Sequence, residues 1–127
     1  MALRGDSDVV PSWRAGIDKP IGVLRLEPEE LARRCGLMFE ESHDDLDYVR
    51  QARIESSSGR RYALVRHRGC PSPGTEIVTA SDSLDLASDL DDALRSLGLT
   101  SSDLTWRHPQ ATVAAEAAHV GSATDGR

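Results

Sequence analysis

The middle of the chain carries hydrophobic patterns that are typical of β-strands. In residues 46–55 apolar side chains recur at about every second position, the period of a strand with one buried face. The centre of 60–68 is apolar at successive positions, as in a strand covered on both faces. Residues 75–80 are rich in β-branched side chains. With the turns between them, these segments predict a three-stranded antiparallel β-meander.

Two segments with helical periodicity flank the meander. Residues 28–35 begin with a proline, which is favoured at the first helical position, and a glycine that suits a left-handed helix end follows them. Residues 83–97 carry an apolar stripe at helical spacing, with Asp82 and Ser83 as natural caps. The stripe consists of Leu86, Leu90, Ala93, Leu94 and Leu97. We therefore predict a short N-terminal helix (28–35) and a C-terminal amphipathic helix (83–97).

These elements predict an α+β fold in which both helices pack on one face of the sheet. A short strand is also expected around 23–26, before the first helix. Around this unit we predict a flexible N-terminal arm, a single domain and a flexible Ala-rich tail. Their ranges are 1–19, 20–108 and 109–127.

Three further segments have weaker patterns. Residues 40–45 are acidic and predict a loop. Residues 100–106 predict a turn or an edge strand, with Trp106 folding back onto the core. Trp13 is expected to dock, either on its own domain or on a partner, because a large aromatic side chain is seldom left in water.

Composition narrows the class of protein. Only 4% of residues are aromatic, so the core must be built from aliphatic side chains. The net charge of −6 argues against non-specific binding to nucleic acid, whose phosphates repel an anion. No apolar run has the length of a signal peptide or of a membrane span, and the two cysteines are far apart. We expect a soluble cytoplasmic protein with reduced thiols, without membrane contact and without a cofactor.

Arginine is concentrated in the first predicted hairpin. Residues 50–68 contain six arginines and one acid, Glu55. The six are Arg50, Arg53, Arg60, Arg61, Arg66 and Arg68. Guanidinium groups at this density can bind phosphate or an acidic partner. Alternatively, the acidic segments at 40–47 and 85–92 cover them, since charge runs usually compensate one another.

The predicted order of helix, three strands and helix is similar to that of double-stranded-RNA-binding domains. That family contacts phosphates with lysines at the start of its last helix. Here the same position holds Asp82, Ser83 and Asp85, so the charge has the opposite sign.

A second resemblance concerns Asp82-Ser83-Leu84 at the start of an amphipathic helix. This stretch resembles the phosphopantetheine attachment site of acyl carrier proteins, which implies a prosthetic group on Ser83. The resemblance covers residues 82–90, and in that family the preceding element is a helix, whereas here strands are predicted. An ordinary helix cap explains the same residues.

Metal binding and catalysis have few candidates. Cys35, His43, His67 and Cys70 are the potential zinc ligands, but only the last two are spaced as a tight pair. His67 and Cys70 have no identifiable third member or oxyanion site for nucleophilic catalysis. We therefore expect neither a metal site nor an enzyme.

The sequence favours a small non-enzymatic protein-interaction module. It would be an adaptor, or a neutraliser of the antitoxin or immunity type, that binds another protein through a charged sheet face or edge. An exposed edge would also allow a homodimer. The alternatives are a nucleic-acid- or anion-binding regulator that uses the arginine-rich hairpin, and a carrier-type protein modified at Ser83.

Overall fold

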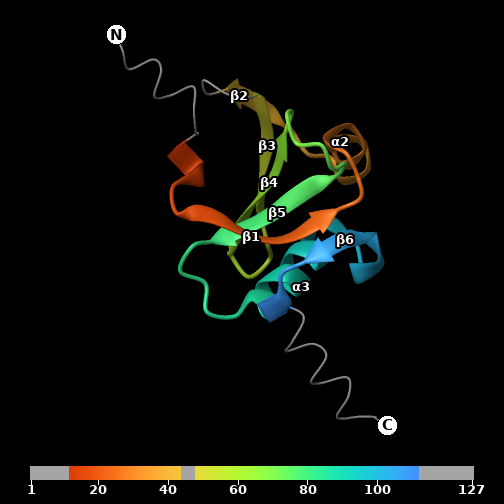
Figure 1. The fold of residues 1–127 in the computed structure, drawn as a ribbon. Coiled ribbons are helices and arrows are strands. Elements are labelled where there is room, and N and C mark those ends of the chain that lie inside the picture. Colours follow the sequence, from red (N-terminus) through yellow and green to blue (C-terminus); the bar gives the residue numbers. More distant parts are fainter. Residues whose placement is uncertain (1–11, 44–47, 112–127) are drawn as a thin grey trace.

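The computed structural model describes residues 12–43 and 48–111, and these form one antiparallel sheet with helices on one face (Figure 1). The sheet has six strands in the order β2-β3-β4-β5-β1-β6. The predicted α+β class is therefore confirmed, but the predicted three-stranded meander understates the sheet. Most of the predicted arm and tail, and residues 44–47, lie outside the described residues.

Four consecutive strands form the middle of the chain, and the helices lie before and after them. The strands are β1 (Ile17–Leu24), β2 (Glu40–His43), β3 (Tyr48–Glu55), β4 (Arg61–His67), β5 (Thr75–Ala80) and β6 (Leu104–Arg107). The helices are α2 (Pro28–Cys35) and α3 (Leu86–Leu97), with short 3₁₀ turns η1 (Ser12–Arg14) and η2 (Ser101–Asp103).

The meander forms as predicted and makes up the centre of the sheet. β3 and β4 pair from Val49↔His67 to Glu55↔Arg61, and β4 pairs with β5 through Ala63↔Val78. Gly59 closes the first hairpin with φ 89°, a conformation that favours glycine. The three hydrophobic patterns and the turns between them are therefore sufficient to locate these strands.

Three strands were missed or only partly predicted. β1 begins at Ile17, so residues 17–19 of the predicted arm belong to the strand, and it lies between β5 and β6. The acidic loop predicted at 40–45 is wrong for its described part, because Glu40–His43 form β2 and pair with β3. β6 is the edge strand that the sequence offered as one of two possibilities.

One helix has its predicted bounds, and the other begins later than predicted. α2 runs over the predicted 28–35 and ends at Gly36, which has a left-handed φ of 69°. α3 begins at Leu86, three residues later than predicted, because Asp85 caps it by accepting a hydrogen bond from the backbone N–H of Ser88. Ser83 therefore lies in the loop before the helix.

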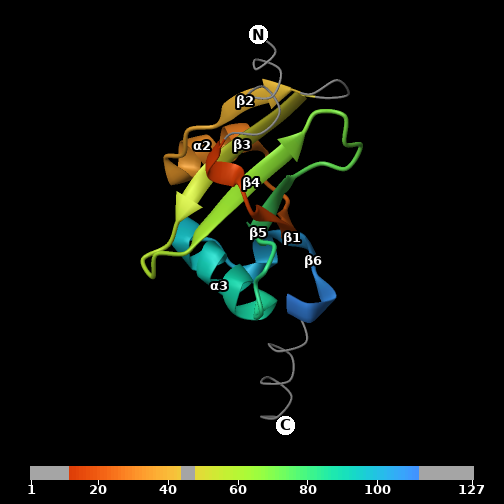
Figure 2. The same ribbon diagram turned by 90° about the vertical axis from the view of Figure 1, so that its left-hand side faces the viewer.

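The two faces of the sheet are covered by different parts of the chain (Figures 1 and 2). The main core lies between the sheet and the helices and is centred on Leu64, Ile77 and Leu90, all fully buried. The other face carries a smaller apolar cluster against which Trp13 packs. This cluster consists of Ile17, Val49, Ala63, Val65 and Val78. The predicted docking of Trp13 on its own domain is confirmed, and the face opposite the helices is partly covered by η1.

Candidate functional site

The six arginines of the predicted binding surface do not lie together. Strand alternation places Arg53 and Arg61 on the same face as Ala63, opposite the helices. Arg50 and Arg66 lie on the helix-covered face, where they are direct cross-strand partners. Arg60 and Arg68 flank β4 at its two ends, so the predicted single basic surface is divided into separate environments.

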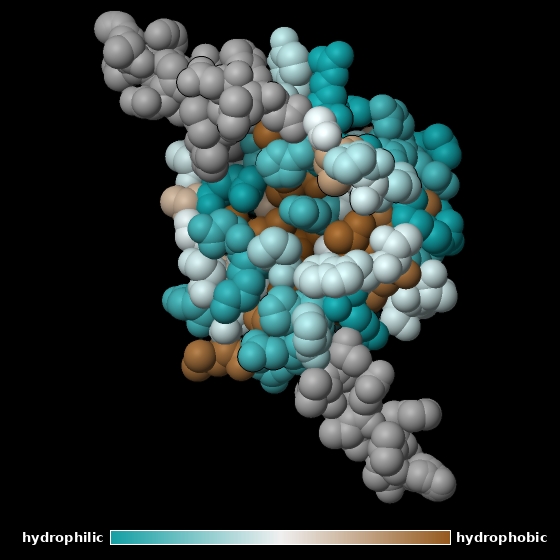
Figure 3. Space-filling model, viewed as in Figure 1, coloured by the Kyte–Doolittle hydropathy of each residue, from teal (hydrophilic) through white to brown (hydrophobic). Residues whose placement is uncertain are grey.

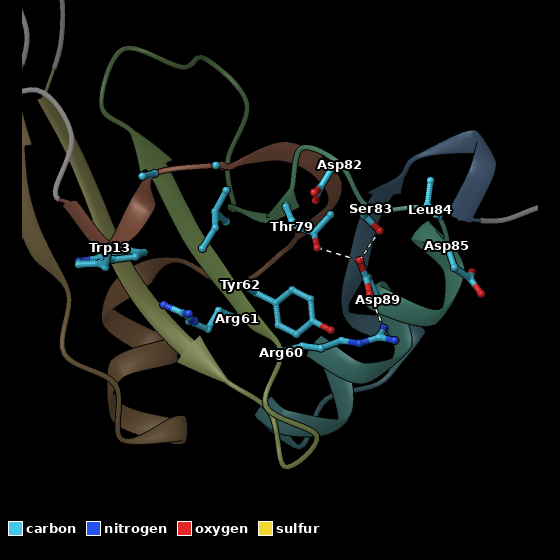
Figure 4. Close-up of a pocket in the computed structure, with 14 residues that line it drawn as sticks. Trp13, Arg60, Arg61, Tyr62, Thr79, Asp82, Ser83, Leu84, Asp85 and Asp89 are labelled. Atoms are coloured by element: carbon cyan, nitrogen blue, oxygen red, sulfur yellow. Dashed lines mark hydrogen bonds and ion pairs between the residues drawn. The ribbon is translucent and has the colours of Figure 1, made fainter.

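Arg60 is bound by the C-terminal helix through a buried carboxylate (Figure 4). Its Nη1 donates to Asp89 Oδ1 at 2.5 Å. The other oxygen of Asp89 accepts from Thr79 Oγ1 at 2.9 Å and from Ser83 Oγ at 2.5 Å. Leu84 and Asp85 point away from this group in Figure 4. The carboxylate thus ties β5, the loop before α3 and the β3–β4 hairpin together.

The environment of Ser83 differs from that of a carrier-protein attachment site. Its hydroxyl is engaged by Asp89, and the element that precedes it is β5 rather than a helix. The residue lines a pocket of about 660 Å³ with Trp13, Arg61 and Tyr62. This arrangement favours a structural role for Ser83 in fixing the start of α3.

A second buried carboxylate on α3 binds the hydroxyl of Tyr62. Tyr62 Oη donates to Asp92 Oδ2 at 2.6 Å, and the tyrosine is fully buried. Burial acts to raise the pKa of Asp92, but hydrogen bonds from Tyr62, Ser56 and Ser58 outweigh it and lower that pKa. Burial and the bond to Asp92 both raise the pKa of Tyr62. Both groups therefore keep their ordinary charge states at neutral pH.

Arg50, Arg66 and Arg68 line a pocket of about 570 Å³ beside the start of α2. Arg50 Nη1 donates to Glu29 Oε2 at 2.6 Å, and this hydrogen bond lowers the pKa of Glu29. Arg66 Nε lies 3.5 Å from Glu27 Oε1. The guanidinium of Arg68 lies over the ring of Tyr48, 5.1 Å from its centroid. In this pocket the chain's own acids compensate its arginines, as one of the two sequence interpretations holds.

The candidate metal ligands are not assembled. Within residues 12–43 and 48–111 there is no group of three or more side chains that could hold a metal ion. Cys35 donates to the carbonyl of Leu97 at the end of α3. His67 and Cys70 instead line a pocket near β6. The side chain of His43 lies outside the description.

A pocket with a largely apolar lining was not predicted from the sequence. A pocket of about 650 Å³ lies beside β6, next to the loop between β4 and β5. Val23, Val65, Pro73 and Trp106 form much of its apolar lining. Trp106 is 44% exposed, so the prediction that it folds back onto the core is wrong. Only the presence of a rare aromatic residue near a predicted edge strand pointed to this place.

The exposed position of Trp106 follows from an irregularity in the pairing of β1 with β6. Leu104 pairs with Leu24 and packs against the main core, while Trp106 pairs with Val23. Thr105 is an extra residue between these two pairs, so Trp106 faces the side opposite to Leu104 although the two residues are two positions apart. On the face viewed in Figure 3, apolar side chains are visible in hollows between polar ones. The ring of Trp106 is met edge-on by that of His108, at 6.1 Å between centroids.

Comparison with known proteins identifies no relative: no family model, no curated protein and no solved structure matches the chain. Among the described residues, no helix is both long and apolar enough to span a bilayer.

Proposed function

We propose that this chain is a non-enzymatic protein-interaction module that binds an extended segment of a partner protein along β6. The observation that carries the proposal is an exposed tryptophan on an edge strand, beside an apolar pocket. In strand addition, main-chain hydrogen bonds give affinity, and pockets for alternate side chains give specificity. β6 offers both parts of such a site.

The two edge strands of the sheet, β2 and β6, differ in how readily they would pair with another strand. β2 carries Glu40 and Glu41, and acidic side chains at an edge discourage pairing, particularly in a chain with a net charge of −6. β6 has the sequence Leu-Thr-Trp-Arg, with one charge and no proline. Among the described strands none pairs with its outer side. The β6 edge is therefore the more receptive of the two.

The pocket defines what the partner segment needs. Its lining by Val23, Val65, Pro73 and Trp106 suits one aliphatic or aromatic anchor side chain. A second copy of this chain could use the same edge, which is the homodimer expected from the sequence. An adaptor or an antitoxin- or immunity-type neutraliser would act through such a surface, and the small size and separated charges support that more specific proposal.

The division of the arginines weighs against the nucleic-acid alternative. Arg50, Arg60 and Arg66 are each within 4 Å of a carboxylate of the same chain. A phosphate backbone would have to compete with these acids at three of the six arginines, and the net charge opposes its approach.

The test is a selection of random peptides on the full chain, followed by affinity measurements with the peptides selected. Trp106→Ala should weaken binding by about tenfold or more, because buried tryptophans dominate such interfaces. Leu84→Ala is the matched control, since Leu84 is fully exposed on the loop before α3. Binding should also slow amide hydrogen exchange in β6. Peptides that bind the Trp106→Ala variant as tightly as the wild type would show that another surface is used.

A further inference from the structure

The pocket beside α2 brings three guanidinium groups together on one end of the sheet. Arg50 and Arg66 are direct partners in the β3–β4 register, and like charges in that position repel. Arg68, just beyond the end of β4, lines the same pocket. The first residues of α2, Pro28 and Glu29, also line the pocket, so the positive end of the helix dipole adds to the field. Three carboxylates in the same pocket, those of Glu27, Glu29 and Glu41, offset this repulsion.

The carboxylates that offset the positive charge of these arginines are held in place with different strengths. Glu27 is fixed, because its Oε2 accepts from the backbone N–H of Gly74 at 2.8 Å. Glu29 and Glu41 are 68% and 67% exposed, and exposed ion pairs contribute little to stability. Glu41 lies 3.8 Å from Arg50 Nε, too far for a hydrogen bond. Among the described residues this buried Nε has no hydrogen-bond partner.

We infer that this pocket binds a phosphate monoester group, and that the carboxylate of Glu29 is a tethered competitor for the same position. The ligand's oxygens would accept from Arg50 and Arg68 after Glu29 turns into solvent. Arg66 would contribute mainly its charge, because its Nη1 already donates to the carbonyls of Ser72 and Gly74. Arg50 and Arg66 come from paired strands, and Arg68 lies over the ring of Tyr48, so little ordering is needed beyond the release of Glu29.

The ligand class follows from the presence of that competitor. A free carboxylate offers the same chemistry as Glu29 but lacks the high effective concentration of a tethered group. A phosphate monoester carries about −1.5 to −2 charges near neutral pH and three acceptor oxygens, so it can match several guanidinium forks at once. A phosphodiester carries a single negative charge, so it would gain less binding energy from these arginines than a phosphate monoester. The inference thus excludes nucleic-acid backbones and does not depend on β6.

The decisive comparison is between two substitutions on adjacent residues of α2. Glu29→Gln removes the competitor, whereas Glu30→Gln removes the same charge from a residue that pairs with Arg33 and Arg34 instead. Titrations of the full chain with inorganic phosphate, phosphoserine and adenosine monophosphate, at low salt, should show Glu29→Gln binding about three- to tenfold more tightly than wild type. Glu30→Gln should stay within about twofold of wild type.

Arg50→Gln should weaken binding of the same ligands by about tenfold or more, as expected for loss of a charge-assisted contact. The ranking of the three ligands identifies the source of the group: a free ion, a modified side chain or a nucleotide. A short single-stranded DNA should not bind. Equal gains in the two glutamate variants would show a general field effect and overturn the inference. So would the absence of saturable binding by the Glu29→Gln variant while its thermal melting is unchanged.

Discussion

The hydrogen bond between Tyr62 and Asp92 allows a direct test of how much a buried polar contact contributes to the free energy of unfolding. Tyr62→Phe removes one buried hydroxyl and leaves the ring in place. The lost bond is 2.6 Å long and its acceptor is a carboxylate that is 8% exposed. Hydrogen bonds to charged groups contribute about 1.5–3 kcal/mol, so the free energy of unfolding at neutral pH should fall by about 2 kcal/mol. Domains of this kind have about 5–15 kcal/mol in total.

The same substitution should change the response to acid. The folded-state pKa of Asp92 is lowered, so its stabilising effect is present above the unfolded carboxyl pKa of about 3.9 and is lost as the pH falls through the folded value. In the Tyr62→Phe protein the opposing effect of burial is no longer outweighed by that bond. The difference in unfolding free energy between wild type and variant should therefore shrink toward about pH 3.

Urea denaturation at several pH values measures both effects. Asp92→Asn and the double variant complete a mutant cycle, with an expected coupling of about 1–2 kcal/mol. Asp91→Asn is the matched control, because Asp91 is the next residue of α3 and is 67% exposed. A Tyr62→Phe deficit of the same size at acid and neutral pH would refute the reasoning, as would a coupling energy near zero.

Two further predictions concern a glycine and the two cysteines. Gly74 has φ 107°, and an added Cβ would lie 2.1 Å from the carbonyl oxygen of Leu24, so Gly74→Ala should lower the unfolding free energy by about 3 kcal/mol or more in urea titrations. With a thiol reagent Cys70, which is exposed, should react first. Cys35 should react later, because burial raises the pKa of its thiol and it donates to Leu97; Cys70→Ser should remove the fast phase alone.

The local elements could be predicted because their patterns are short-range. The apolar stripe of 83–97 and the alternation in 46–80 depend on neighbouring residues alone. The predicted start of α3 was wrong because Ser83 donates a hydrogen bond to Asp89, and Asp85 caps the helix instead. The residues before α3 can either cap the helix or make a tertiary contact. A sequence pattern does not show which of these roles each residue takes.

The candidate sites depended on contacts that a sequence does not show. The arginines of 50–68 are close together in the sequence, but strand alternation places Arg53 on one face of the sheet and Arg50 on the other. Trp106 was expected in the core, and its exposure depends on the irregular register between β1 and β6, which turns it away from the side that Leu104 faces. A shift of one residue in register would reverse that outcome.

The sequence by itself determined the α+β class, the central meander, the two helices and the excess of negative charge. Only the tertiary structure decided that β1 lies between β5 and β6, and which carboxylate meets each arginine. Periodicity is set by the geometry of the backbone and can be seen in adjacent residues. The neighbours of a strand are chosen by the burial of whole faces, which brings together residues as distant as Arg25 and Asp103.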